Sequence, residues 1–186
     1  ANPDWAVELG YSTERLDAVN RAAVDLAEEV RSAAAVDGLT AVVSGCIGPR
    51  GDGYDPGEAM SAAEAQRYHS AQIDSFATTS ADQVTAITMT NVAEAIGVVR
   101  AASAAGIASA VSFTVETDGR LPTGQALQQA IEQVDAETDA AAAYFMVNCA
   151  HPTHFGGALE AGGAWLARVV GVRVNSSVRS HAELDA

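Results

Sequence analysis

The feature that most constrains the fold is a regular alternation of short apolar runs with amphipathic helical patterns. Each helical pattern places apolar residues three and four positions apart, and each apolar run has the length of a strand. Repeated units of this kind build a parallel sheet covered by helices. The predicted strands are 39–44, 83–89, 107–114, 141–147 and 169–174, and the predicted helices are 13–31, 61–76, 91–104, 124–134 and 152–166.

Polar or conformationally special residues mark the end of every predicted strand, and this separates two folds that share the alternation. In a (β/α)8 barrel all strand ends converge on one rim, where a ligand can touch each of them. In an open doubly wound sheet only the switch point would need such residues. The pattern therefore favours the barrel, and the five strand ends are 44–46, 88–91, 112–116, 148–149 and 175–177.

A complete barrel of this type has eight strands in about 250 residues, whereas this chain of 186 residues carries five predicted strands. We therefore expect an α/β fold of the (β/α)8 TIM-barrel type, present as a partial barrel of about five parallel strands with alternating helices. The expected organisation is a single domain over residues 1–186, the central and later part of a barrel. Such a sheet has two open edges, which favour association with another copy.

The charge of the chain limits the classes of molecule that it can bind. A formal net charge of -14 repels phosphates and excludes nucleic acid and an anionic membrane surface. All ten basic residues are arginine, and a chain without lysine cannot carry out Schiff-base chemistry or use the phosphate-loop lysine. The sequence shows neither a signal peptide nor a long apolar run, so we expect a cytoplasmic protein that binds small molecules.

The apolar run 141–147 leads directly into Asn148 and Cys149, which makes this strand end a candidate site. Cys149 has three interpretations: a small buried apolar residue, a nucleophile assisted by His151, or a thiolate ligand of a metal. Two arrangements involve the second cysteine, Cys46. These are a zinc cluster of Cys46, Cys149 and His151, and a disulfide between the two cysteines.

The glycine-rich segment 45–54 permits close approach of the backbone to a ligand but lacks the phosphate-binding patterns. It is either a tight turn at the rim or a site where Arg50 binds a carboxylate and Asp52 an amine. Glu116 is either a turn residue or a partner for a substrate amine. Among the histidines, His69 lies on a helix face, and capping or surface positions are expected for His151, His154 and His181.

Several of these strand ends carry motifs that together resemble one known family. At these residues the chain resembles the homocysteine S-methyltransferase family, and the resemblance covers nearly its whole length. The similar segments are Ser44-Gly45-Cys46-Ile47-Gly48-Pro49-Arg50-Gly51, Asn91 with Glu94-Ala95, Ser112-Phe113-Thr114, Asp118-Gly119-Arg120-Leu121 with Gly124, and Asn148-Cys149.

The resemblance implies a (β/α)8 barrel in which three thiolates hold zinc at the rim. Zinc would keep the sulfur of homocysteine as a thiolate, which takes a methyl group from S-methylmethionine or S-adenosylmethionine and yields methionine. Carried over to this sequence, it makes Cys149 one zinc ligand, with the remaining ligands expected outside this chain segment. It places Asn148, Glu116, Asn175 and Thr88 near the substrate and assigns no residue as a direct catalyst.

The chain departs from the family pattern at three points. Residues 1–186 contain neither the glycine-glycine-cysteine-cysteine motif that supplies two further zinc ligands nor the acidic-glycine motif of the first strand. Ile87 stands where many members have a glutamate that holds the substrate amino group. Two alternatives therefore stay open: a metal-free barrel relative that binds a small amino acid or sulfonium compound without catalysis, and an incomplete, inactive fragment. The methyl donor and the acceptor thiol also stay open.

Overall fold

The computed structural model describes residues 1–36, 38, 40–51, 53, 57 and 59–184. Its centre is a five-stranded sheet in the order β1-β2-β3-β4-β5, in which every neighbouring pair is parallel. Sequential parallel strands joined by helices are the connectivity of a TIM barrel, so the predicted partial barrel is confirmed. The strands are β1 Ser44–Ile47, β2 Gln83–Met89, β3 Ala108–Phe113, β4 Tyr144–Asn148 and β5 Val169–Arg173.

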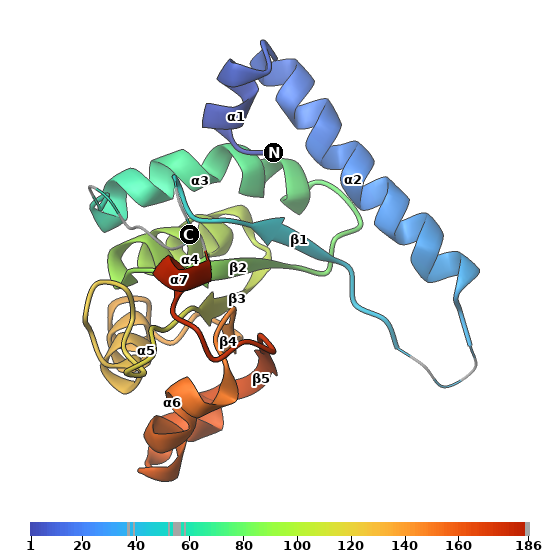
Figure 1. Ribbon diagram of the computed structural model, residues 1–186. Coiled ribbons are helices and arrows are strands. Elements are labelled where there is room, and N and C mark those ends of the chain that lie inside the picture. Colours follow the sequence, from blue (N-terminus) through green and yellow to red (C-terminus); the bar gives the residue numbers. More distant parts are fainter. Residues whose placement is uncertain (37, 39, 52, 54–56, 58, 185–186) are drawn as a thin grey trace.

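Helices connect the strands, and α3, α4 and α5 follow one another along one face of the sheet (Figure 1). Helix α2 extends away from the body as an arm. Local capping sets where α3 and α4 begin: the side chains of Ser61 and Glu64 form the predicted capping box, and Asn91 accepts the N–H of Glu94. The helices are α1 Pro3–Glu8, α2 Thr13–Ala33, α3 Ala62–Ala77, α4 Val92–Ala105, α5 Leu127–Glu137, α6 Pro152–Glu160 and α7 His181–Leu184, with a 3-10 helix η1 at Ala164–Arg168.

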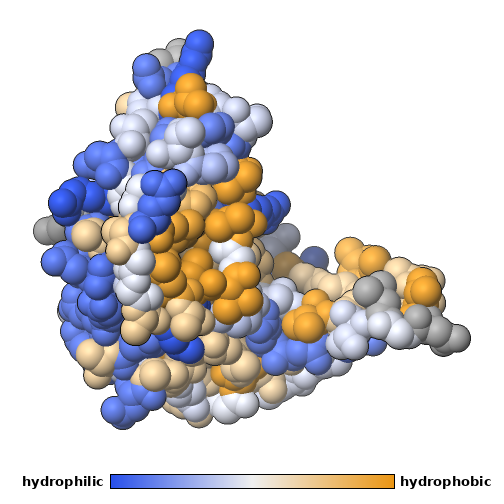
Figure 2. Space-filling view, turned by 90° about the horizontal axis from the view of Figure 1, so that it is seen from below, coloured by the Kyte–Doolittle hydropathy of each residue, from blue (hydrophilic) through white to orange (hydrophobic). Residues whose placement is uncertain are grey.

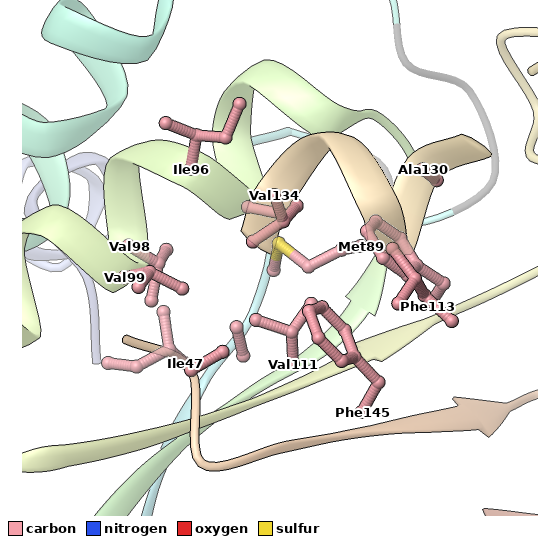
Figure 3. Packing of buried hydrophobic residues seen from close by; sticks show 14 of the residues in the cluster. Ile47, Met89, Ile96, Val98, Val99, Val111, Phe113, Ala130, Val134 and Phe145 are labelled. Carbon is pink, nitrogen blue, oxygen red and sulfur yellow. The ribbon is translucent and has the colours of Figure 1, made fainter. Parts of the chain in front are cut away.

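The hydrophobic core fills the space between the sheet and these helices. Figure 3 shows Ile47 and Val111 of the strands together with Val99 and Val134 of the helices, and all four side chains are buried. Helices α3 and α4 pack so closely that a Cβ atom at Gly97 would lie 2.4 Å from the Cβ of Ala65. One face of the sheet is therefore committed to packing, and the opposite face is left for a ligand.

Strand β1 begins later than expected, at Ser44, and Leu39 lies outside the described residues. The preceding residue, Val43, donates its N–H to the carboxylate of Asp82, and its carbonyl accepts the N–H of Asp82. Ladder pairing with β2 starts only at Ser44, opposite Gln83. Cys46 consequently lies within the strand and not beyond its end.

The prediction of one helix over 152–166 is wrong. Helix α6 ends at Glu160, because Gly162 and Gly163 follow with φ values of 77° and 126°, which a helix cannot accommodate. The chain then forms the 3-10 helix before β5. Helix α5 likewise starts at Leu127, after a turn in which Gly124 donates its N–H to the carbonyl of Leu121.

Exposed apolar side chains concentrate beside the two edge strands. Figure 2 shows them gathered on one face of the body and again on the protruding arm. No helix among the described residues is long and apolar enough to cross a membrane. The exposed large apolar residues in and after β5 are Val170, Val172, Val174 and Val178, and those of the arm that leads into β1 are Leu26, Val30, Val36 and Val42.

Candidate functional site

The face of the sheet that points away from the helices forms a hollow of about 260 Å³. Its residues alternate along the strands with those that enter the core, and the register aligns them across the sheet, as in the pairs Cys46 with Thr85 and Asn148 with Arg173. We call this feature the hollow. It is lined by Ser44, Cys46, Thr85, Ile87, Ser112, Met146, Asn148 and Arg173.

Asn148 joins three strands at the carboxyl end of the hollow. Its Oδ1 accepts the backbone N–H of Thr88 at 3.0 Å and the hydroxyl of Ser112 at 2.6 Å. Its Nδ2 donates to the hydroxyl oxygen of Thr88 at 2.7 Å. Because the Asn148 side chain is fully buried, these bonds fix the ends of β2, β3 and β4 relative to one another.

Thr88 and Cys149 both adopt a left-handed backbone conformation, with φ values of 60° and 55°. This region is unfavourable for residues with a side chain, and residues held in it are enriched at functional sites. At Thr88 the strain coincides with an irregular register between β2 and β3 after Ala86. The result is that the Cys149 Sγ lies 3.9 Å from the Thr88 hydroxyl, at the edge of the sheet and partly exposed.

His181 connects the end of β4 to the segment after β3. Its Nδ1 lies 3.0 Å from a carboxylate oxygen of Glu116, and its Nε2 lies 2.9 Å from the carbonyl oxygen of Cys149. A carbonyl oxygen only accepts, so Nε2 carries the hydrogen of that bond. The expectation of a capping or surface role for His181 is wrong, because the side chain is buried between these partners. Glu116 is accordingly more than a turn residue.

Asn175 follows β5 and donates its backbone N–H to the carbonyl of Ala150 at 3.0 Å. The structure therefore brings Asn148, Thr88 and Cys149 into one contact network. It links Glu116 to that network through His181, and it places Asn175 beside Ala150 through the backbone. Their predicted roles toward a substrate stay predictions.

The two cysteines are free, so the disulfide alternative is wrong. Within the described part of the chain, no three or more histidine, cysteine or acidic side chains converge to hold a metal ion. This contradicts the cluster of Cys46, Cys149 and His151. The imidazole of His151 instead caps α6, where its Nδ1 accepts the N–H of Thr153, as a capping role predicts.

Zinc in proteins is held by three or four side chains drawn from cysteine, histidine and the acidic residues. Cys149 fits as one such donor, since its sulfur is partly exposed at the sheet edge. The described residues do not complete the ligand set around it. Cys46 faces the hollow from β1, where the surrounding strands exclude enough water to raise the pKa of its thiol, against an opposing effect of the positive charge of Arg173.

A second polar cluster holds the loop after β1 and lies away from the hollow. The buried carboxylate of Glu94 accepts from the backbone N–H of Arg50 at 2.7 Å and lies 2.9 Å from Nε2 of His69. The Arg50 guanidinium bonds to Asp4 at 2.9 Å and stacks over the ring of Tyr68, whose pKa is raised by burial. Arg50 already has a carboxylate partner of its own.

The alternative in which Arg50 and Asp52 bind substrate groups receives no support from this geometry, and Asp52 and Tyr54 lie outside the described residues. Sequence reasoning missed two residues of the candidate site, His181 and Arg173. The approach of His181 to the end of β4 depends on the path of the chain, which no local pattern reveals.

Comparison with known proteins adds a family match and a fold match. The sequence model of the family described as Homocysteine S-methyltransferase matches residues 1–184. Among solved structures, the metallated form of the homocysteine methyltransferase MmuM from Escherichia coli superposes with a TM-score of 0.77 at 19% identity, covering 96% of this chain and 73% of that chain. The apo form gives 0.70 at 19% identity over 91% and 72%. At this identity the likeness demonstrates the fold alone, and no curated protein matches.

Proposed function

Because this chain belongs to the homocysteine S-methyltransferase family, we propose that it transfers a methyl group from a sulfonium donor to the sulfur of homocysteine, giving methionine. The donor is S-methylmethionine or S-adenosylmethionine. The observation that carries the proposal is the position of Cys149, a partly exposed thiol held beside Thr88 and Asn148 at the carboxyl edge of a barrel-type sheet. This edge is where TIM-barrel enzymes carry their active sites.

The reaction needs homocysteine as a thiolate, although a free thiol with a pKa of about 8.5 is mostly protonated at neutral pH. Zinc, if bound here, would supply the positive charge that keeps such a sulfur deprotonated. We propose that Cys149 is one of its ligands and that the remaining ligands come from outside the described residues. The thiolate lone pair then forms the new sulfur–carbon bond while the methyl–sulfur bond of the donor breaks, and the donor leaves as a neutral thioether.

The protein side chains at this edge would position the reactants. Asn148 and Thr88 hold the strand ends at a fixed spacing, which keeps the Cys149 sulfur in place before the substrate arrives. The carboxylate of Glu116 is partly exposed, and we propose that it binds the substrate ammonium group. Asn175, half-buried next to Ala150, would border the substrate on the β5 side.

The test is methionine formation from homocysteine with each donor, in the presence and absence of added zinc. We expect Cys149→Ser to abolish product formation. Methionine formation that survives this substitution, or its absence with both donors, would overturn the proposal. The metal is tested separately by zinc titration against a colorimetric chelator.

We expect zinc to bind this chain in the micromolar range or more weakly, because one thiolate is too few for a tight site. Cys149→Ser should remove that binding, whereas Cys46→Ser should leave it unchanged. Nanomolar affinity of the chain for zinc, or loss of binding in Cys46→Ser, would contradict the assignment of Cys149 as the single thiolate ligand.

A second candidate function is binding of a small amino acid or sulfonium compound without zinc. Two observations favour it: the described residues contain no cluster of three or more histidine, cysteine or acidic side chains that could hold a metal ion, and the apolar Ile87 lines the hollow. Calorimetry with homocysteine and S-methylmethionine separates the two candidates, because binding that is indifferent to zinc supports only the second.

A further inference from the structure

Arg173 is the one charged residue among the described residues that line the hollow. It lies on β5 in register with Asn148 on β4, so both side chains belong to the same face of the sheet. The N–H of Cys149 donates to the carbonyl oxygen of Arg173 at 3.1 Å. The guanidinium therefore extends over the hollow from a backbone position directly beside Cys149.

The charge of Arg173 is not balanced within the described part of the chain, where no carboxylate pairs with it. Several other arginines do have carboxylate partners, as in the ion pairs of Arg31 with Asp82, Arg50 with Asp4 and Arg168 with Asp135. What distinguishes Arg173 is that it lines the hollow. The Arg173 charge reaches across the hollow, since it opposes the rise in the pKa of the Cys46 thiol on β1. In a chain with a net charge of -14 the hollow is thus a local positive site.

We infer that Arg173 determines substrate specificity by binding the carboxylate of the thiol substrate. A guanidinium offers two parallel N–H groups that match the two oxygens of a carboxylate. The rest of the lining suits a short aliphatic chain, because the apolar side chains of Ile87 and Met146 lie beside the hydroxyl groups of Thr85 and Ser112. The inference rests on the proposed function only in taking homocysteine as the substrate, since carboxylate binding itself depends on the hollow alone.

Two analogues of homocysteine separate the contribution of the carboxylate to binding from that of the amine. 4-Mercaptobutanoate keeps the thiol and the carboxylate but lacks the amine, and 3-mercaptopropylamine keeps the thiol and the amine but lacks the carboxylate. Binding of both analogues and of homocysteine is measured by the shifts of backbone amide signals in nuclear magnetic resonance titrations of the full chain. We expect 4-mercaptobutanoate to bind about tenfold more tightly than 3-mercaptopropylamine.

Variants then assign the effect to Arg173. Arg173→Met should weaken homocysteine and 4-mercaptobutanoate by about tenfold and leave 3-mercaptopropylamine unchanged. Arg173→Lys keeps the positive charge but lacks the two parallel N–H groups. Its affinity for homocysteine and 4-mercaptobutanoate should lie between that of the unchanged chain and that of Arg173→Met. Arg67→Met is the matched control, because Arg67 is exposed on α3 and its loss changes the net charge equally. It should behave as the unchanged chain.

The outcomes separate this inference from the proposed function. Methionine formation and homocysteine binding that are equal in the unchanged chain and in Arg173→Met would overturn the inference and leave the function standing. Carboxylate binding that depends on Arg173, in a chain that forms no methionine, would support the inference and overturn the function. Tighter binding of 3-mercaptopropylamine than of 4-mercaptobutanoate, or no binding of any of the three compounds, would also overturn the inference.

Discussion

The two sides of the sheet edge use the same residue types for different purposes. On the β1 side His69 pairs with Glu94, and on the β4 side His181 pairs with Glu116. The first pair is almost fully buried, with side chains 1% and 4% exposed, whereas Glu116 of the second pair is 33% exposed. The contacts of Glu94 are all internal, while the second pair reaches the carbonyl of Cys149.

The comparison shows that a histidine–carboxylate pair does not by itself mark an active site. Glu94 accepts from a histidine, a backbone N–H and the amide of Asn91, so its carboxylate is fully occupied by internal partners. Glu116 keeps a partly exposed carboxylate beside a cysteine in a strained conformation. The β1 side therefore stabilises the fold, and the β4 side positions reactive groups.

The largest expected difference concerns stability. Glu94→Ala should lower the free energy of unfolding by about 3 kcal/mol, because it leaves buried donors without an acceptor. Glu116→Ala should cost about 1 kcal/mol, since water can replace a partly exposed carboxylate. Urea denaturation followed by circular dichroism measures both, with Glu94→Gln as the variant that keeps the shape and one acceptor. Equal losses in the two alanine variants would remove the distinction between the two sides.

A smaller and more local effect is expected for the histidines. His181→Ala frees the carbonyl of Cys149 and loosens α7, so amide hydrogen exchange in residues 148–150 should rise by about fivefold or more. His181→Gln, whose amide can still donate to a carbonyl, should restore part of the protection. His69→Ala should lower global stability more while leaving exchange at 148–150 unchanged relative to the rest of the core. Exchange at 148–150 that responds equally to both alanine variants would show that the two sides are coupled.

The smallest expected effect concerns the reactivity of the Cys46 thiol. Because burial raises the pKa of the Cys46 thiol, its alkylation by iodoacetamide should require a higher pH than that of a free thiol, measured by mass spectrometry in a Cys149→Ser background. Arg173→Met should move this pH still higher by removing a favourable positive charge. The folded chain holds the thiol proton more tightly than the unfolded chain does. This contribution to stability is therefore intact below the ordinary pKa of a thiol and is lost as the pH rises from there through the raised pKa of Cys46 in the folded chain. Alkylation of Cys46 at the pH of a free thiol would contradict this description of the hollow.

Much of the fold could be predicted from local patterns. The strand over 83–89 has its predicted bounds, and the capping box at Ser61 and Glu64 starts α3 as expected. Errors arose where a local signal competed with pairing or with chain reversal. Strand β1 starts where its partner β2 begins, and α6 stops early because Gly162 and Gly163 both take positive φ values.

The residues at the strand ends of the candidate site could be predicted from the sequence, whereas Arg173 and His181 could not. The apolar strand that ends in Asn148 and Cys149 was visible in the sequence, as were Thr88 and Glu116 at neighbouring strand ends. Arg173 was hidden inside a predicted strand, where the face of each residue depends on the register with β4. His181 was hidden because its partners are 32 and 65 positions away along the chain.

The amino-acid sequence by itself determined the alternation of strands and helices, the barrel type of connectivity, the family and the position of a cysteine at a strand end. These properties follow from periodicity and from short motifs, which act over a few residues. Only the tertiary structure decided which histidine serves the site, which arginine lines the hollow, and that Thr88 contacts Asn148 from another strand. Such pairings join residues far apart in the chain, and burial and sheet register select them only when the whole sheet has formed.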